Sequence, residues 1–383
     1  MGADFLASLA EVAPNPAALT NVTLPTRRSE AWKYGGLSAL YKQRFSNDVV
    51  AQDTPSALSS AGISATVIDG KLALAGQGVA VSEIGLEQFD TQAVDWCDAW
   101  SRAFSPAAYR VDVTEDCSVE LVHVQTGEGA QAHSRIQWNV AAGVNFSLVE
   151  RYVSSQNAAS TQVCELHLAE TATVKHIQIP ISDATHHRMG ATTAKLQSKA
   201  NYHFDSFAAA CAWHRQSVRV VMAGEHAHAD INGVFLAGGR EQIDTRLEVE
   251  HAVANCTTTE TWRGLAGARG SASFVGRIHI HKNAQKSDAQ LSSRNILLSN
   301  TAQINTKPEL EIYADDVVCA HGATVGQLDD AQLYYLQSRG IAEHRARELL
   351  TFAFINELIM GVEDDALRGH IEQQLREAFA GLA

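Results

Sequence analysis

The alternation of hydrophobic and polar positions divides the chain into three regions. Residues 1–106 have mostly helical spacing with one short strand-like patch, residues 107–328 form short alternating runs, and residues 329–383 return to helical spacing. Alternation with period two is typical of strands, whereas apolar residues three or four apart indicate helices. The sequence therefore predicts a mainly β protein, with a β core between an N-terminal helical region and a C-terminal helical domain.

The N-terminal region combines several short elements. A polar stretch at about 46–60 predicts a loop, and a Gly-punctuated patch at 65–74 predicts short strands. Residues 86–104 predict a helix that carries Trp96 and Trp100 on one face, because the two residues are four apart.

A repeat in the middle region predicts how its strands are arranged. A small residue or valine followed by alternating polar and apolar positions opens at Val144, Ala172, Ala200 and Ala227, in steps of 28, 28 and 27 residues. Repeats of this length in a strand-rich segment are typical of a β-solenoid, in which each coil stacks on the last. The absence of an amphipathic helix from this region excludes a doubly wound α/β fold. We therefore expect a parallel β-helix, with a β-sandwich as the alternative.

The C-terminal region predicts helices with apolar stripes. Asp329 suits an N-cap, and Gly340 ends the first segment. The stripe of the longer helix at about 343–360 consists of Ala346, Leu349, Leu350, Ala353, Phe354 and Leu358, and that of the last helix of Leu367, Ile371, Leu375, Phe379 and Leu382. We expect these helices to cap the end of the solenoid, since an exposed sheet edge invites aggregation. Stripes of this kind also suit the docking of a partner.

Composition and charge narrow the function classes. The chain has 383 residues with 30 Lys and Arg against 43 Asp and Glu, a formal net charge of −13. This balance argues against a protein whose main role is to grip nucleic acid or an anionic membrane. The N-terminus lacks a basic signal-peptide pattern, and no apolar run approaches the roughly 18 residues of a membrane span. Six cysteines lie far apart without a CxxC pair, so we expect reduced thiols and a cytoplasmic protein.

Sequence motifs of common enzymes are absent. No phosphate-binding loop, GxSxG elbow, HExxH helix or dinucleotide-binding glycine motif occurs. We therefore expect a protein that is not an enzyme, and if ATP drives its function, another chain hydrolyses the nucleotide.

Two pairs of histidines are candidate metal ligands. His226/His228 and His279/His281 have i, i+2 spacing, which on a strand places both rings of a pair on one face. Two ligands are too few for a complete site. We favour hydrogen-bonded histidines on an outer face over a metal site.

Cys319 and His321 form a sharper pair. The two side chains point the same way on a strand, and thiol and imidazole are both ligands for iron, zinc or a cluster. By residue type alone, a buried cysteine beside a structural histidine is the simpler interpretation.

Segments near both ends of the chain resemble a known family. Residues 276–328 (GRIHIHKNAQKSDAQLSSRNILLSNTAQINTKPELEIYADDVVCAHGATVGQL), followed by LYYLQSRGI, resemble the C-terminal signature of the SufB/SufD family. RRSEAWKY at 27–34 resembles the R-x-x-E-A-W-K-Y element of the same family, although Gly35 and Gly36 depart from the Thr-Pro often found next. The short chain, without an N-terminal cysteine cluster, is more similar to the SufD branch than to the SufB branch.

The resemblance implies function by assembly. It implies a right-handed parallel β-helix, flanked by helical regions, that pairs with SufB through the β-helices and with the ATPase SufC through the C-terminal helices. Such a complex builds iron–sulfur clusters and hands them to apo-proteins. On this chain the SufC contact would use Leu349, Leu350, Phe354, Leu358, Ile371 and Leu375.

The resemblance also implies where a cluster is held. The C-x-H-G element of the family maps onto Cys319 and His321, so iron or a nascent cluster is expected at the SufB interface. His321 is then the expected ligand, with Cys319 beside it. One coil edge cannot complete a tetrahedral site, so we expect a shared, transient site and no cofactor held tightly by this chain alone. Pairing of the chain with itself when SufB is absent stays open.

Two alternative functions stay open. A β-helix carbohydrate-active enzyme would need clustered carboxylates on an exposed coil face, whereas Asp315 and Asp316, adjacent on a strand, would point to opposite faces. A purely structural SufB-like scaffold differs in one respect, because replacing His321 would leave cluster delivery intact.

Overall fold

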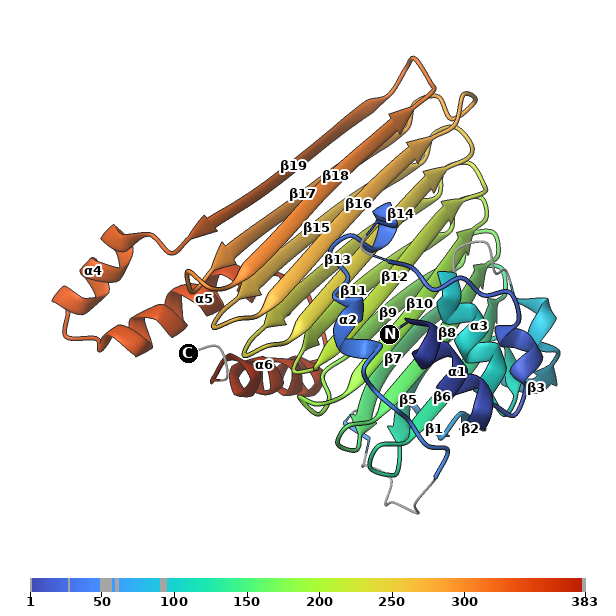
Figure 1. Cartoon of the computed structure of the whole chain (residues 1–383). Coiled ribbons are helices and arrows are strands. Elements are labelled where there is room, and N and C mark those ends of the chain that lie inside the picture. The colour runs from blue at the N-terminus through green and yellow to red at the C-terminus, as the bar shows by residue number, and fades with distance from the viewer. Residues whose placement is uncertain (1, 27, 49–56, 59–61, 90–94, 381–383) are drawn as a thin grey trace.

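The chain forms a long parallel β-helix with helical segments on both flanks (Figure 1). The computed structural model describes residues 2–26, 28–48, 57–58, 62–89 and 95–380. Most of the predicted loop at 46–60 therefore lies outside the described residues, as does the middle of the predicted helix at 86–104.

The strands alternate between two sheets that face each other. Over the described residues, one sheet has ten strands in the order β19-β17-β15-β13-β11-β9-β7-β5-β1-β2, and the other has nine in the order β18-β16-β14-β12-β10-β8-β6-β4-β3. The ten-stranded sheet comprises β1 (Ile63–Ile68), β2 (Lys71–Ala73), β5 (Cys117–Gln125), β7 (Asn145–Ser154), β9 (Thr173–Ile179), β11 (Asn201–Ala209), β13 (His228–Ala237), β15 (Thr257–Ala266), β17 (Asp288–Leu297) and β19 (Val318–Gln327). The nine-stranded sheet comprises β3 (Val79–Ile84), β4 (Ala108–Val113), β6 (Gln131–Val140), β8 (Ala159–Leu168), β10 (His187–Leu196), β12 (Trp213–Met222), β14 (Gln242–His251), β16 (Ser271–Ile280) and β18 (Gln303–Ile312).

The helices lie before and after the coils. They are α1 (Gly2–Val12), α2 (Leu37–Leu40) and α3 (Asp95–Phe104) on the N-terminal side, with short 3-10 turns η1 (Pro16–Leu19), η2 (Glu30–Trp32) and η3 (Leu86–Gln88), and α4 (Asp330–Ser338), α5 (Glu343–Met360) and α6 (Asp365–Ala380) on the C-terminal side. None of the helices in the described part of the chain is long and apolar enough to cross a membrane.

Strand pairing confirms the parallel β-helix and excludes the sandwich. Thr173 of β9 pairs with Asn145 of β7 and Asn201 of β11, and Asn201 pairs with His228 of β13, all in parallel ladders. These pairings have the 28- and 27-residue steps of the sequence repeat. The strand patch at 65–74 belongs to the same structure, because β1 pairs in parallel with β5 and antiparallel with β2.

Each repeat begins at the same turn of a coil. Val144, Ala172, Ala200 and Ala227 are buried directly before β7, β9, β11 and β13. The residue before each of them has a positive φ, between 58° and 74°, a region that sharply redirects the chain. His226 is one of these turn residues, with φ 61°, so the expectation that His226 and His228 lie together on a strand is wrong.

The N-terminal region covers the outer face of the nine-stranded sheet. Trp96 and Trp100 stack with ring centroids 5.2 Å apart, as their spacing on α3 predicts. Together with Phe5 of α1 they belong to one apolar cluster with Met189 and Trp213 of the sheet. Aromatic residues of this size contribute much of the apolar area that such a packing interface buries.

The segment with the sequence RRSEAWKY, which we call the strap, lies across the outer face of the nine-stranded sheet. Arg27 lies outside the described residues, but the guanidinium of Arg215 on β12 lies 3.7 Å above the ring of Trp32 and pairs with Asp244 of β14. Glu30 contacts Lys307 of β18 at 2.7 Å. The strap therefore joins the N-terminal region to coils near the other end of the β-helix.

The C-terminal helices pack on the outer face of the ten-stranded sheet. Asp329 caps α4 by accepting a hydrogen bond from the Ala331 backbone at 2.8 Å, as predicted. Phe352 and Ile355 of α5 then pack in one cluster with Phe207 and Val234 of the sheet. The expected cap over the end of the solenoid is wrong, because apolar side chains on the flank of the middle coils attract α5 and α6 instead.

The buried face of α5 also differs from the predicted stripe. Its buried residues are Ala346, Thr351, Phe352, Ile355, Leu358 and Ile359, so only Ala346 and Leu358 of the predicted set are buried. Leu349 is 39% exposed. Phe352, Ile355 and Ile359 follow helical spacing equally well, and only the position of the sheet decides which face is covered.

One carboxyl group is buried inside the β-helix without a hydrogen-bond partner among the described residues. Glu260 of β15 is fully buried, and neither of its carboxyl oxygens has such a partner. Its neighbours in the ladder are Ile231 and Leu291. Burial raises the pKa of Glu260 well above its ordinary value, so the folded protein holds this side chain as the neutral acid.

Glu260→Gln should therefore raise the melting temperature at pH 8, by roughly 2 °C or more, and change it less at pH 5. A raised folded-state pKa means that wild-type stability falls as pH rises above the ordinary pKa, because only the unfolded chain releases the proton readily. The neutral amide of the variant has no proton to release and carries no such penalty. Thermal unfolding of both proteins at the two pH values measures the effect.

Glu250→Gln is the matched control with the opposite sign. Although burial opposes it, hydrogen bonds from His281 and Arg219 lower the pKa of Glu250, so its contribution to stability is present above the ordinary carboxyl pKa. This variant should lose stability at pH 8. A Glu260→Gln protein with an unchanged pH profile would contradict the buried neutral acid.

Candidate functional site

The end of the β-helix formed by β18 and β19 is open (Figure 1). Within the described part of the chain, β18 pairs in its sheet only with β16, and β19 only with β17. β18 carries Lys307 and Pro308, residues that discourage edge pairing. β19 carries no charged residue and no proline along its ten positions, so it is an edge of the kind that accepts another strand.

The backbone orientation of β19 follows from its first hydrogen bond. Val318 donates its N–H to the Ser287 carbonyl at 2.9 Å, toward β17. Since successive residues of a strand face opposite neighbours, the backbone groups of positions 319, 321, 323 and 325 face the open side. The backbone N–H and C=O groups of Cys319 and His321, the candidate ligand residues, therefore lie at the free edge.

Cys319 and His321 lie on the inner face of this last coil. They pair with Ala289 and Leu291 of β17, which are 0% and 4% exposed in the interior of the β-helix. His321 is exposed, whereas Cys319 is half-buried and packs on the core. Burial raises the pKa of the Cys319 thiol, so iron would have to displace its proton.

The open end is apolar around this pair. Ile312, Tyr313, Val318 and Val325 of the last coil are large apolar residues that are 40–64% exposed, more apolar surface than a free end needs, which favours an interaction surface. Among the described residues, no set of three metal-ligating side chains includes Cys319 or His321. A complete site at this end would therefore need ligands from a second chain.

The pair His279/His281 lies outside the β-helix. The two rings are 4.5 Å apart, His279 lies 3.5 Å from Glu311, and His281 lies 2.7 Å from Glu250. These contacts are those expected of hydrogen-bonded histidines on an outer face.

The residues predicted for a SufC contact fall into two groups. Leu349 is exposed and Leu350 and Phe354 are partly exposed on α5, and α4 projects beside them (Figure 1) with Tyr334 73% and Tyr335 56% exposed. Leu358, Ile371 and Leu375 are buried in the cluster that joins α5 and α6 to the sheet. Only the first group is available to a partner, while the second fixes the helices in place.

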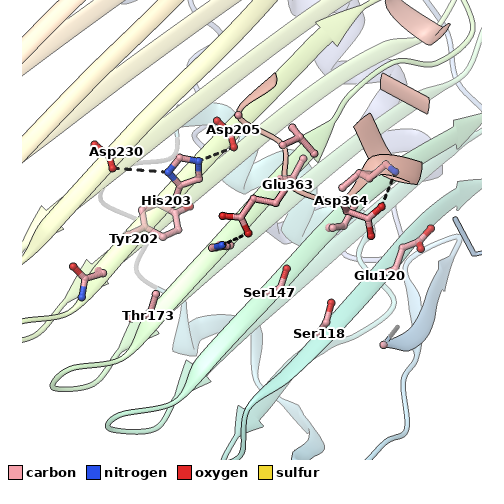
Figure 2. A pocket seen from close by; sticks show the side chains of 18 of the residues that line it. Ser118, Glu120, Ser147, Thr173, Tyr202, His203, Asp205, Asp230, Glu363 and Asp364 are labelled. Carbon is pink, nitrogen blue, oxygen red and sulfur yellow. Dashed lines mark hydrogen bonds and ion pairs between the residues drawn. The ribbon is translucent and has the colours of Figure 1, made fainter. Parts of the chain in front are cut away.

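A cavity of about 350 Å³ that the sequence did not reveal lies between the ten-stranded sheet and the turn from α5 to α6 (Figure 2). Five carboxylates line it, from Glu120, Asp205, Asp230, Glu363 and Asp364. Each carboxylate has a partner. Glu120 pairs with Arg151, Asp205 with His203, and Asp230 with both His203 and His228. Glu363 pairs with Lys175, and Asp364 accepts a hydrogen bond from the Leu367 backbone. The lining comes from six strands of the ten-stranded sheet and from a turn distant in the sequence, so no local sequence motif predicts the cavity.

The charges in this cavity do not suit acid catalysis. His203 lies 2.8 Å from Asp205 and also faces Asp230 (Figure 2). Hydrogen bonds to the two carboxylates raise the pKa of His203 to about 10, and those from His203 and His228 lower the pKa of Asp230. A glycosidase needs the reverse, a carboxyl whose pKa is raised so that it can donate a proton.

Comparison with known families decides the assignment. The family described as "SUF system FeS cluster assembly, SufBD core domain" matches residues 102–354, more than half of the chain. The chain belongs to the SufBD family. The matched range contains Cys319, His321 and the exposed part of α5, while Ile371 and Leu375 lie beyond it.

Individual relatives agree with this family. The chain is 28% identical over 385 aligned positions to the iron–sulfur cluster assembly protein SufD of Escherichia coli, covering 95% of this chain and 91% of that protein. It is 33% identical to an iron–sulfur cluster assembly SufBD family protein of Synechocystis, over 55% of this chain and 47% of that one. A SufBD family protein of Mycobacterium leprae is 35% identical over 38% of this chain and 39% of its own length. The resemblance found in the sequence is confirmed.

Proposed function

We propose that this chain is a non-catalytic subunit of a cytoplasmic iron–sulfur cluster assembly scaffold, pairing with SufB through the open end of its β-helix and with SufC through its C-terminal helices. The observation that carries the proposal is the uncharged free edge of β19, with Cys319 and His321 on its inner face. A SufBD relative that adds strands to this edge would extend both the sheet and the apolar core.

Pairing at this edge would change the surroundings of His321. The imidazole is now exposed, and a second β-helix seated on β18 and β19 would bury it between two cores. Neutral imidazole nitrogen and thiolate sulfur are iron ligands, and the partner would supply the remaining ligands. In this arrangement the cluster is cargo, held transiently at the joint between the two chains.

The C-terminal helices suit an ATPase partner. Leu349, Leu350 and Phe354 offer an apolar surface on α5 beside the exposed tyrosines of α4, and the buried contacts of α5 and α6 fix that surface to the middle coils. Movement of SufC on ATP binding would thus be transmitted to the β-helix, and could open the joint at which the cluster is held.

Val325→Lys should prevent the chain from pairing with SufB while leaving the fold intact. Val325 is 41% exposed at the open end, and a lysine there would be desolvated without an opposite charge when the edges meet. We expect affinity for SufB to fall at least about tenfold, measured by size exclusion and co-purification after co-expression.

Val81→Lys is the matched control, because Val81 is 40% exposed on β3 at the other end of the β-helix. The Val81→Lys variant should pair with SufB as the wild type does. Equal pairing by both variants would refute the assignment of the interface to β18 and β19.

His321→Ala should leave the complex with SufB and SufC intact but lower its iron and sulfide content. The substitution removes one ligand and does not alter the backbone edge that pairs. Both quantities are measured on complexes purified anaerobically, with His281→Ala as control, since His281 is similarly accessible but lies outside the β-helix. If the His321→Ala complex keeps its iron and sulfide, His321 is not a cluster ligand and the alternative of a purely structural scaffold is favoured.

Leu349→Glu should abolish co-purification with SufC and preserve pairing with SufB. Leu349 is 39% exposed on α5, and a carboxylate in an apolar contact loses its hydration without a partner. Met360→Glu is the control on the same helix, at a position that is 58% exposed. Loss of SufC from both variants, or from neither, would argue against this face of α5.

A further inference from the structure

A second set of metal-ligating side chains lies deep inside the β-helix, far from the open end. It consists of Glu150 on β7, Cys164 on β8 and His176 on β9, whose ligand atoms all lie within 4.8 Å of one another. The three residues are at most 1% exposed. Within the described residues this is the only set of three such side chains that the fold brings together.

Strand register places these polar side chains among apolar ones. His176 pairs with Leu148 and Phe204 along the ten-stranded sheet, and Cys164 pairs with Ile136 on one side along the nine-stranded sheet. The two sheets contribute donors from opposite walls of the interior. Polar groups buried in such a position need a compensating interaction, and here hydrogen bonds centred on Glu150 provide it.

Glu150 is the centre of a hydrogen-bonded network. Its Oε1 accepts from His123 Nε2 at 3.0 Å, and its Oε2 accepts from His176 Nε2 at 2.8 Å and from Gln178 Nε2 at 2.6 Å. The second ring nitrogen of His176 lies 2.9 Å from the hydroxyl of Tyr202. In metal sites, the second ring nitrogen of a ligand histidine usually hydrogen-bonds an oxygen, and a ligand carboxylate usually accepts further hydrogen bonds. These contacts orient the ligands, and His176 and Glu150 both have them.

We propose that this interior site binds one divalent transition-metal ion through Cys164 Sγ, His176 Nε2 and the Glu150 carboxylate. Mixed sulfur, nitrogen and oxygen donors select zinc, iron(II) or cobalt(II) over magnesium or calcium, which prefer oxygen alone. On binding, the thiol proton leaves to solvent as the Sγ–metal bond forms. The single proton of the neutral His176 ring moves from Nε2 to Nδ1, where it is donated to the Tyr202 hydroxyl oxygen, and the freed Nε2 lone pair binds the metal.

A small cavity lies beside the outer members of this hydrogen-bonded network. It has a volume of about 30 Å³ and is lined by His123, Tyr152 and Gln162, and His123 and Gln162 both hydrogen-bond Glu150. That volume admits about one water molecule, which would contact the partners of Glu150 and none of the three proposed ligands themselves. The cavity lies beside the ends of β5 and β7 rather than at β19, so the polar network is remote from the open end.

Cobalt(II) titration of the purified, reduced full-length chain tests the proposal. Cobalt bound by a thiolate gives an intense near-ultraviolet charge-transfer band, and tetrahedral binding gives strong visible bands. We expect one equivalent to bind the wild type with both features. Cys164→Ser should lose the charge-transfer band, and Glu150→Gln should weaken binding at least about tenfold while keeping that band.

Two control variants separate this site from the rest of the protein. Cys256 is also fully buried in the apolar interior, so Cys256→Ser matches the disturbance to packing and should keep the band. The double variant Cys319→Ser/His321→Ala removes the candidate ligands of the open end and should keep it as well. Circular dichroism and size exclusion verify that each variant folds.

The proposal is independent of pairing with SufB, and its failure has a distinct signature. A wild-type chain that gives no charge-transfer band, or a band that survives Cys164→Ser, would show that Glu150, Cys164 and His176 form a structural network only. A band that disappears in the Cys319/His321 double variant instead would assign the metal to the open end.

Discussion

Parallel backbone pairing between strands one coil apart is the constraint on which this structure depends. Because each strand is bonded to the strands about 28 residues before and after it, the side chains of successive coils stack at fixed positions. The register of the strand pairing therefore determines which residues lie next to each interior side chain. The buried Glu260, the Cys319–His321 pair of the last coil and the polar network around Glu150 are all placed in this way.

The same constraint determines what the flanking helices do. Parallel sheets need cover on both faces, and here the N-terminal segments cover one sheet while α5 and α6 cover the other. Cover is needed where the outward side chains are apolar, which is over the middle coils. The last coil consequently keeps both its edges and its inner face free, and this is where Cys319 and His321 lie.

Much of the β-helix was predictable because its signal is local and repeated. Ala172, Ala200 and Ala227 mark the same turn in successive coils, and the spacing of Cys319 and His321 is enough to place both on one face. The buried face of α5 was not predictable, because Leu349 and Phe352 are equally apolar and only a sheet formed elsewhere in the chain distinguishes them. Glu150, Cys164 and His176 were missed for the same reason: they are separated by 12 or more residues and belong to different sheets.

The two ends of the β-helix differ in how well their edge strands suit the addition of another strand. At the first coil, the sheets end in β2, which has only three residues and begins with Lys71, and in the antiparallel strand β3, which contains Glu83. Short or charged edges of this kind resist strand addition, whereas the ten residues of β19 include no Lys, Arg, Asp, Glu or Pro. A solenoid with two free ends would join head to tail without limit and grow into a fibre. If chains pair through the open end as proposed above, a single free end is occupied by its first partner, and growth along the axis of the β-helix stops at two chains.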